Sequence, residues 1–191
     1  MKFFNKKNIF FKTALIILPL SAGTIAFYKF LHYQVCQSSG IYVYNPQTDR
    51  QFVLDLFKKN WYWLVAESSI NFSPERVLDL KASSERPEDI NKVKNFIYKV
   101  NGKPVGYLAY YLKTFYKGFI YFIVIDAEYR QKGYARKLLE FAIDNLKKEN
   151  VKSIELITRT NNVRAQTLYK SLGFKEMWRD DGFIKYEKEL I

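Results

Sequence analysis

Residues 118–146 read GFIYFIVIDAEYRQKGYARKLLEFAIDNL and combine the signals of a strand, a basic turn and a helix. The first part, Gly118 to Asp126, is apolar, β-branched and aromatic, as expected of a buried strand. From Ala135 onward, apolar residues recur every three or four positions, which predicts a helix with one buried face. A helix start leaves backbone N–H groups unpaired, and its dipole favours negative charge. We therefore expect the turn from Arg130 to Ala135 to bind an anion, most simply a pyrophosphate.

A second strand and a second helix follow in the same order. Val151 to Thr158 has the composition of a strand, and residues 162–174 show helical spacing with Asn161 or Asn162 suited to the N-cap. Gly173 is suited to the end of this helix. The inner face of the helix is formed by Ala165, Leu168, Tyr169 and Leu172.

Both regions resemble signatures of the GNAT N-acetyltransferase family. Residues 130–135, R-Q-K-G-Y-A, resemble the R/Q-x-x-G-x-G/A turn that holds the pyrophosphate of acetyl-CoA in that family. The spacing N-x-x-A-x-x-L-Y-x-x-x-G-F over residues 162–174 resembles the second signature. The two signatures stand about 30 residues apart and in the family's order, which makes the pair more specific than either one.

The remaining segments complete this pattern. Strands are predicted at 41–44, 93–100 and 105–112, helices at 49–60 and from Ser73-Pro74 onward, and a closing hairpin over 174–190 with its turn at Asp180-Asp181-Gly182. The resulting order, β-α-α-β-β-β-α-β-α-β-β, is the order that the family shows. We expect an α+β fold of the GNAT type, with a central, mostly antiparallel sheet flanked by helices.

The resemblance implies a cofactor site and a direct transfer of the acetyl group. In the family, the strand before the turn holds the pantetheine arm through its backbone, which here implies Ile123, Val124 and Ile125. The pyrophosphate would be bound through N–H groups of Arg130, Gln131, Lys132, Gly133, Tyr134 and Ala135. Asn162 matches a position that contacts the cofactor arm, and Tyr169 matches the tyrosine that protonates the leaving thiolate.

The general base is not given by a matching residue. Ile157 occupies a strand position where some protein-acetylating relatives carry a glutamate. Glu155 is two residues away on the same strand face, and Asp126 ends the preceding strand. Either carboxylate could deprotonate the acceptor amine, directly or through water, and Glu155 is our first choice.

Cysteine and histidine usage excludes several chemistries. The chain has 191 residues, one Cys (Cys36) and one His (His32), and both precede the predicted domain. A disulfide framework and a Cys/His metal cluster are therefore excluded, and so is a Ser–His or Cys–His nucleophile pair within the domain. We expect no metal, and proton transfer by Glu, Asp, Tyr, Lys or water.

The N-terminal residues 1–35 are predicted to form a separate segment before a domain at 38–191. They hold five Lys and no acid, within a net charge of +12. Residues 10–31 give 22 residues, enough to cross a bilayer if Lys12 and Lys29 snorkel, and we expect a single-pass membrane anchor. A cleaved signal peptide, leading to secretion, and an amphipathic arm are the alternatives.

The expected topology conflicts with the expected chemistry. More lysines precede the apolar run than follow it, so the positive-inside rule places the N-terminus in the cytoplasm and the domain across the membrane. Acetyl-CoA is in the cytoplasm, so for an active enzyme we expect the domain to face the cytoplasm.

Three classes of function are compatible with the sequence. The first is an acetyltransferase that moves the acetyl group of acetyl-CoA to an amine of a protein or small molecule. The second is a non-catalytic domain of the same fold that binds CoA esters or the membrane surface. Nucleic-acid binding is third, because no reading module is recognised. The cluster Trp61-Tyr62-Trp63 is interpreted either as helix packing or as a wall of the acceptor pocket.

Overall fold

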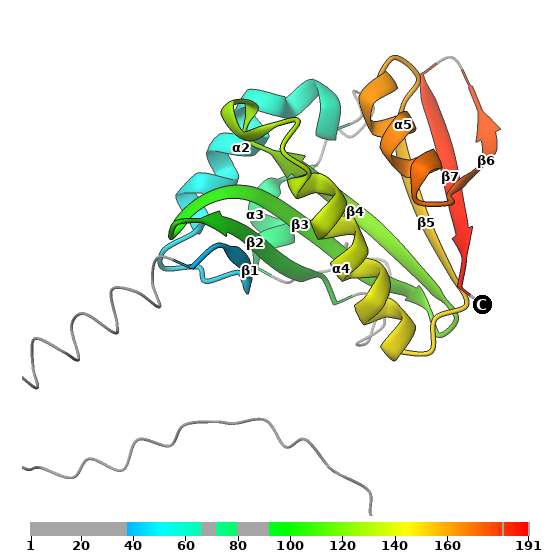
Figure 1. Cartoon of the computed structure of the whole chain (residues 1–191), viewed down its shortest axis with the longest axis horizontal. Coiled ribbons are helices and arrows are strands. Elements are labelled where there is room, and N and C mark those ends of the chain that lie inside the picture. The colour runs from blue at the N-terminus through cyan, green and yellow to red at the C-terminus, as the bar shows by residue number, and fades with distance from the viewer. Residues whose placement is uncertain (1–37, 66–71, 80–91, 181, 191) are drawn as a thin grey trace, which may run out of the picture. The chain divides into compact units, whose positions relative to one another are not determined.

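The computed structural model describes residues 38–65, 72–79, 92–180 and 182–190. They form a seven-stranded sheet of order β1-β2-β3-β4-β5-β7-β6 with helices on both faces (Figure 1). The strands are β1 (Gly40–Val43), β2 (Lys94–Val100), β3 (Lys103–Thr114), β4 (Lys117–Ile125), β5 (Ser153–Arg159), β6 (Lys175–Arg179) and β7 (Phe183–Glu189), and the helices are α2 (Arg50–Leu64), α3 (Pro74–Leu78), α4 (Tyr134–Lys148) and α5 (Val163–Ser171). Neighbouring strands are antiparallel except β4 and β5, which are parallel. This confirms the predicted fold class and order of elements.

The two hairpin turns predicted from the sequence have the backbone that their residues favour. Asn101 and Gly102 both have positive φ, 49° and 76°, as a two-residue type I′ turn requires. In the closing hairpin, the Asp180 carboxylate accepts hydrogen bonds from the N–H groups of Gly182 at 2.8 Å and Phe183 at 2.6 Å. Local turn chemistry therefore fixes the register of both hairpins.

Side chains of β3 alternate between two cores, one on each face of the sheet. Leu108 and Tyr110 are buried in the core that includes α4 and α5. Tyr107 and Ala109 are buried in the core that includes α2 and α3. Figure 1 shows α4 crossing one face, with α2 and α3 on the other. This alternation explains why β3 reads as a continuous apolar run rather than as a half-polar strand.

The sheet opens between its two central parallel strands. The ladder between β4 and β5 begins at Lys117 and Ser153 and ends at Ile120 and Leu156. Immediately afterwards the register of β4 against β3 shifts, because Tyr110 pairs with Ile120 but Ala109 pairs with Phe122. The skipped residue is a β-bulge, which bends a strand. Beyond this point the strands separate, and β5, β7 and α5 diverge from the rest of the sheet (Figure 1).

Helix α2 continues further than the sequence predicted. The expected end at Asn60 is instead a break, with φ −122° and ψ 20°, after which the helix resumes to Leu64. The aromatic cluster at 61–63 therefore belongs to the last turn of α2. The predicted anchor at 10–31 lies outside the described residues. Within the described part of the chain, every helix is too short or too polar to cross a bilayer.

Candidate functional site

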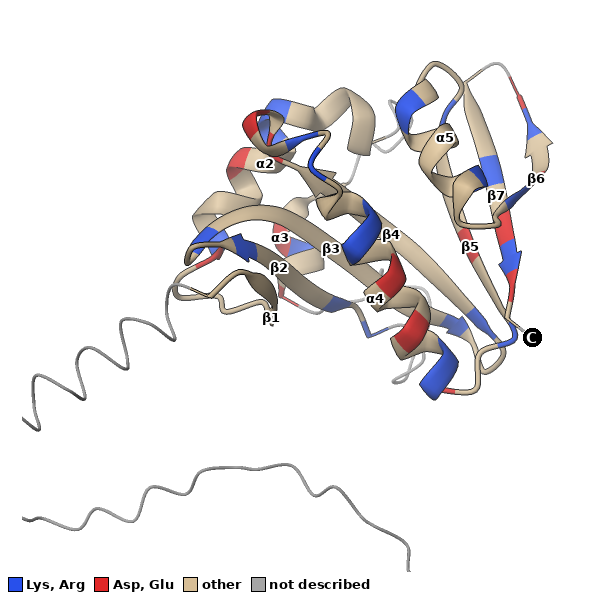
Figure 2. Cartoon of the chain, in the orientation of Figure 1, with Lys and Arg blue, Asp and Glu red and all other residues tan. Residues whose placement is uncertain are grey.

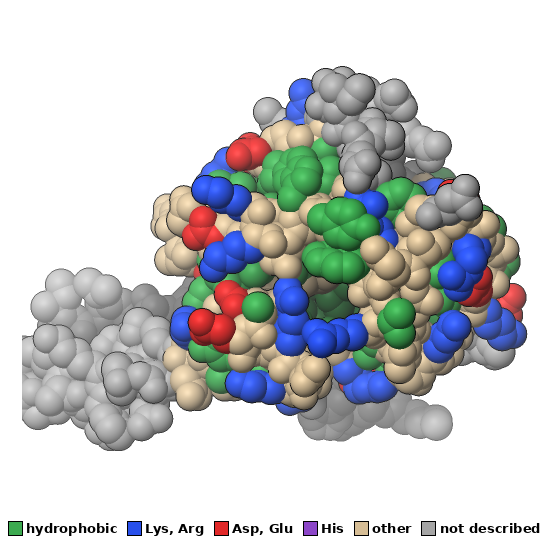
Figure 3. Space-filling view, turned by 90° about the horizontal axis from the view of Figure 1, so that it is seen from above, with side chains coloured by type: hydrophobic (Ala, Val, Ile, Leu, Met, Phe, Trp, Pro, Cys, Tyr) green, Lys and Arg blue, Asp and Glu red, His purple; other side chains and the backbone are tan. Residues whose placement is uncertain are grey.

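A cavity of about 830 Å³ lies where β4 and β5 separate. Five segments line it: the end of α2, residues 120–125 of β4, the turn and start of α4, residues 156–158 of β5, and residues within 161–169 at the start and along α5. Figure 3 shows a hollow with basic side chains at its edge and hydrophobic side chains beside it. The predicted strand residues Ile123, Val124 and Ile125 line this cavity. On the side facing β5 their backbone has no partner strand in the described sheet, so it can pair with a ligand.

The turn before α4 has the backbone of an anion site. Gln131 and Gly133 have φ of 63° and 80°, and Gly133 is the N-cap of α4 without a side-chain cap. Left-handed residues in such a turn direct successive N–H groups to one side, and the first N–H groups of α4 have no intrahelical partner. A Cβ at Gly133 would meet nothing within 4 Å, so conformation rather than space requires glycine here.

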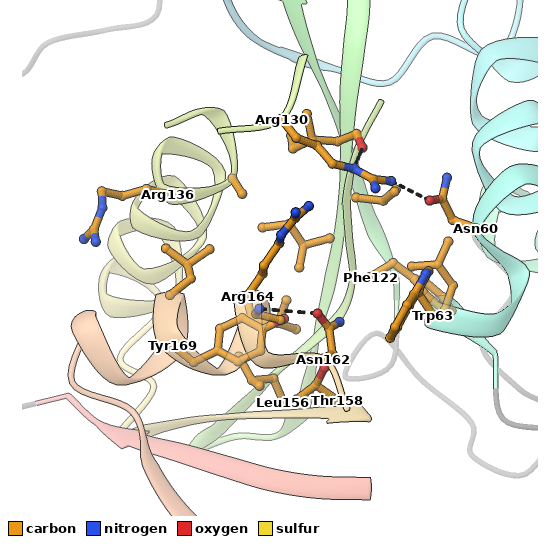
Figure 4. A pocket seen from close by; sticks show the side chains of 18 of the residues that line it. Asn60, Trp63, Phe122, Arg130, Arg136, Leu156, Thr158, Asn162, Arg164 and Tyr169 are labelled. Atoms are coloured by element: carbon orange, nitrogen blue, oxygen red, sulfur yellow. Dashed lines mark hydrogen bonds between the residues drawn. The ribbon is translucent and has the colours of Figure 1, made fainter. Parts of the chain in front are cut away.

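Some side chains of the turn at 130–135 line the cavity, and others contact neighbouring protein groups. Gln131, Gly133, Tyr134 and Ala135, four of the residues expected to bind pyrophosphate, line the cavity. Lys132 is absent from the described lining, and its ammonium lies 5.0 Å from the ring centre of Tyr129. Arg130 lines the cavity, but its guanidinium donates hydrogen bonds to Ile125 O and to Asn60 rather than pointing freely inward (Figure 4).

Two further arginines line the cavity and were not identified from the sequence. Arg136 is in the first turn of α4, where it donates a hydrogen bond to Ser171 Oγ at 2.7 Å. Arg164 is in the first turn of α5 and extends towards the middle of the cavity (Figure 4). Both follow the N-cap of a helix by two or three residues, a position that sequence reasoning could have tested. Their charges favour an anionic ligand.

Asn162 lines the cavity and caps α5. Its side-chain oxygen accepts a hydrogen bond from Ala165 N at 3.4 Å, which is weak but has the geometry of an N-cap. The sequence predicted both the cap and a contact with the cofactor arm. With the oxygen used by the helix, the amide N–H groups of Asn162 are the part available to a ligand.

Tyr169 is held at the wall of the cavity by other aromatic rings. It is 6% exposed and lines the cavity from α5. The ring centres of Phe174 and Tyr186 lie 6.1 Å and 5.8 Å away. Burial, and to a smaller extent Tyr186, raises the pKa of the Tyr169 hydroxyl. The group therefore keeps its proton at neutral pH and can donate it.

Glu155, the first choice of general base from the sequence, is buried among three lysines. It is 1% exposed, and its carboxylate lies 2.7 Å from Lys113 Nζ, 2.9 Å from Lys117 Nζ and 2.8 Å from Lys185 Nζ. Burial alone would raise the pKa of this carboxyl, but the three ammonium groups outweigh it and lower the pKa to about 2. Figure 2 shows basic positions gathered at this end of the sheet.

Glu155 is also absent from the described lining of the cavity. Its three ion pairs join β3, β4, β5 and β7, and a carboxylate of lowered pKa is a weaker proton acceptor. Asp126, the other candidate, caps the short 3-10 turn Ala127–Tyr129 by accepting a hydrogen bond from Glu128 N. Neither carboxylate is among the described residues that line the cavity.

The aromatic cluster of α2 divides between both of its expected roles. Trp61 packs against Phe72, with ring centres 5.8 Å apart. Trp63 lines the cavity and faces Phe122 (Figure 4). Ile157, 45% exposed, lies on the β5 side of the same cavity. The cavity thus has an apolar side opposite its basic side.

Comparison with known proteins agrees with this site. Residues 53–174 match the family described as the acetyltransferase (GNAT) family. This is well over half of the chain, and the chain therefore belongs to the GNAT acetyltransferase family.

Two relatives are N-acetyltransferases by their names. The chain is 37% identical over 82 residues to the [ribosomal protein bS18]-alanine N-acetyltransferase of Escherichia coli K12, covering 43% of this chain and 55% of that protein. It is 38% identical over 63 residues to N-alpha-acetyltransferase 30 of Saccharomyces cerevisiae, covering 33% and 36%. The chain thus spans about half the length of these relatives or less.

Solved structures share the fold over nearly their full length. PaiA N-acetyltransferase from Thermoplasma acidophilum, solved with coenzyme A, has a TM-score of 0.65 at 19% identity, covering 80% of this chain and 99% of that one. The E. coli ribosomal-protein-S18-alanine N-acetyltransferase has a TM-score of 0.59 at 23% identity, covering 80% and 94%.

Proposed function

We propose that the protein is an N-acetyltransferase that moves the acetyl group of acetyl-CoA directly to an amine. One observation carries this proposal: the anion-binding turn before α4 and the hydroxyl-bearing Tyr169 line the same cavity, next to the unpaired edge of β4. The family and the names of the relatives support a catalytic domain over a non-catalytic domain that binds CoA esters.

The residues of the cavity fit acetyl-CoA. The N–H groups from Gln131 to Ala135 and the charges of Arg136 and Arg164 suit the phosphates, and the free backbone of residues 123–125 suits the amides of the pantetheine arm. Bound acetyl-CoA supplies a thioester carbonyl as the electrophile. Asn162 offers amide donors beside this arm.

Tyr169 completes the transfer by giving up a proton. As the amine nitrogen forms its bond to the acetyl carbon, the carbon–sulfur bond breaks and leaves a thiolate. Tyr169 donates its proton to that sulfur, because its hydroxyl is protonated at neutral pH and the residue lines the cavity. The attacking nitrogen releases one proton as the amide forms, and a proton taken up from solvent restores the Tyr169 hydroxyl.

We infer that the acceptor is the α-amine of a protein or peptide. The names of the E. coli and yeast relatives, an alanine N-acetyltransferase and an N-alpha-acetyltransferase, support this class. An α-amine has a pKa of about 7.7–8.0, whereas a lysine side chain has a pKa of about 10.4. A sizeable fraction of α-amine is therefore neutral at physiological pH, and attack does not depend on a strong base in the protein.

The test measures thiol release from acetyl-CoA by the purified chain. The acceptors are a peptide with a free N-terminal alanine and the same peptide with a blocked N-terminus and an internal lysine. Turnover with the first and little with the second is expected. Turnover with the lysine alone would overturn the α-amine proposal, and no turnover with any amine would overturn the catalytic one.

We infer further that residues 10–31 anchor the protein in a membrane with the domain facing the cytoplasm. The uncharged run from Thr13 to Tyr28 and its flanking lysines support an anchor, and the need for acetyl-CoA supports the orientation. A reporter fused to the C-terminus and active only in the cytoplasm tests this. Activity of a periplasmic or luminal reporter instead would contradict it, as would recovery of a shortened, secreted chain.

A further inference from the structure

Asn60 uses both ends of its side-chain amide at the break in α2. The residue is 7% exposed, and its backbone leaves the helical region. Its Nδ2 donates a hydrogen bond to Leu56 O, four residues back, at 2.9 Å. Its Oδ1 accepts a hydrogen bond from Arg130 Nη2 at 2.7 Å. The side chain therefore holds the first part of α2 and contacts a residue 70 positions away.

Arg130 joins this break to the anion-binding turn. Its Nε donates a hydrogen bond to Ile125 O, at the end of β4, at 3.1 Å. It is also the first residue of the turn that continues through Gln131 to Gly133. Figure 4 shows the guanidinium lying between the backbone of its own segment and Asn60. One side chain thus links the end of β4, the turn and the break in α2.

The short helical segment after the break forms the opposite side of the cavity. Trp63 and Leu64 line the cavity from this segment. Its direction depends on the backbone at Asn60, because that residue separates it from the first part of α2. A change in the position of Arg130 can therefore shift Trp63, because the hydrogen bond from Arg130 to Asn60 connects the two segments.

We propose that Asn60 is a positioning residue that couples cofactor binding to the acceptor side of the cavity. The hydrogen bond from Arg130 to Asn60 is in place without a ligand. When the turn binds phosphate, Arg130 becomes less mobile, and this bond then holds the segment 61–64, and with it the wall that the amine meets, more firmly. This inference rests on the proposed function, because it takes coenzyme A as the ligand of the turn.

Hydrogen exchange tests the coupling without requiring a known acceptor. The amides of residues 61–65 are followed in the full chain with and without saturating coenzyme A, and calorimetry measures binding of coenzyme A to each variant. In the unaltered protein, coenzyme A is expected to slow exchange by about fivefold or more, the range of typical coupling between sites. Asn60→Ala is expected to bind coenzyme A but to lose this slowing.

Two variants separate coupling from simple loss of structure. Asn60→Asp keeps an oxygen for Arg130 but loses the donor to Leu56 O, so it is expected to keep the slowing. Asn145→Ala is the matched control: Asn145 also donates its amide to the carbonyl four residues back, Phe141 O at 3.0 Å, in α4. It is expected to behave like the unaltered protein.

The outcomes are distinct. The coupling is overturned if coenzyme A still slows amide exchange in Asn60→Ala, or if Asn60→Asp loses this slowing as completely as Asn60→Ala. It is also overturned if coenzyme A binds the unaltered protein without slowing exchange. Failure of the unaltered protein to bind coenzyme A overturns the proposed function instead. If Asn60→Ala does not fold, Arg130→Ala, which changes an exposed residue, is expected to show the same loss at saturating coenzyme A.

Discussion

Ile120 of β4 and Leu156 of β5 form the last pair of the parallel ladder between the two strands. Beyond this pair β4 continues to Ile125 and β5 to Arg159, but the two strands separate. Ligands of open sheets bind in the crevice beyond the carboxyl ends of parallel strands. Here the turn before α4 follows the carboxyl end of β4, and α5 follows that of β5. The anion-binding turn and Tyr169 therefore line the same cavity between the two strands.

Gly133→Ala should weaken acetyl-CoA binding because of the backbone of the turn. Gly133 has φ of +80°, a conformation that costs an alanine about 1 kcal/mol, so the turn is expected to relax and its N–H groups to lose their alignment. We expect about a tenfold higher Kd, measured by calorimetry.

Gly173→Ala is the control for this prediction. Gly173 has φ of +82° but follows α5 away from the turn, so a similar loss of stability is expected with unchanged acetyl-CoA affinity. Equal Kd values for the two variants would show that the turn does not bind the cofactor.

Tyr169→Phe should lower kcat by about a hundredfold, as loss of a general acid does. The phenylalanine keeps the ring contacts with Phe174 and Tyr186, so the Kd for acetyl-CoA should change less than about twofold. Because burial raises the pKa of Tyr169, its protonated form persists as pH rises, and it should cause no loss of kcat until above pH 10. A basic limb near pH 8 that disappears in Tyr169→Phe would contradict this assignment.

Tyr186→Phe provides the matched control. Its hydroxyl is buried and has no hydrogen-bond partner among the described residues, and the residue is absent from the described cavity lining. Removing an unsatisfied buried hydroxyl is expected to leave kcat unchanged and to be neutral or stabilising, by up to about 1 kcal/mol. A loss of kcat as large as in Tyr169→Phe would contradict the assignment of Tyr169, and not Tyr186, as the proton donor.

Glu155→Gln should lower stability without changing the acidic limb of the pH–rate profile. The folded pKa of about 2 is below the value of about 4.3 in an unfolded chain. The stabilisation, about 3 kcal/mol, is therefore complete above pH 4.3 and is lost as pH falls through 2. Denaturant unfolding of both proteins at pH 7 and pH 3 should show the difference shrinking at the lower pH.

Glu187→Gln is the control for Glu155. Glu187 contacts Lys117 at 3.3 Å and is more exposed, so it is expected to lose less than about 1 kcal/mol. A Glu155→Gln enzyme with full stability but a flattened acidic limb would restore Glu155 as the base.

Arg159→Lys should loosen the end of α2 and raise the KM for the acceptor. The buried Arg159 guanidinium donates hydrogen bonds to Tyr62 O and Val65 O and stacks 4.0 Å from the centre of the Tyr62 ring. A lysine cannot reproduce this geometry, and a stability loss of about 1.5–3 kcal/mol is expected, with little change in the Kd for acetyl-CoA. Arg179→Lys, an exposed change on β6, should have little effect on either quantity. An unchanged KM for the acceptor in Arg159→Lys would show that the end of α2 does not form part of the acceptor side of the cavity.

The sequence was sufficient to predict the fold and the turn that lines the cavity before α4, because both depend on local signals. The glycine with positive φ at 133, the N-cap Asn162 and the apolar run of β4 each leave a pattern that short-range physics explains. The same holds for Tyr169, whose helical spacing places it on the inner face of α5.

The remaining features depend on contacts between distant segments. Glu155 reads as a candidate base until its three lysines, on β3, β4 and β7, are brought beside it. Asn60 reads as the end of a helix, since its partner Arg130 is 70 residues away. Arg136 and Arg164 read as exposed helix residues, and only the separation of β4 and β5 places both at one cavity. Periodicity and spacing describe neighbouring residues only, so they do not predict which polar groups of distant segments will pair.

Titration of the purified protein with acetyl-CoA in a calorimeter is the most direct test of the cofactor site. We expect saturable binding at one site per chain, competed by coenzyme A, because the turn before α4 and the free edge of β4 recognise parts that both molecules share. Absence of heat and of any thermal shift with either molecule would contradict it.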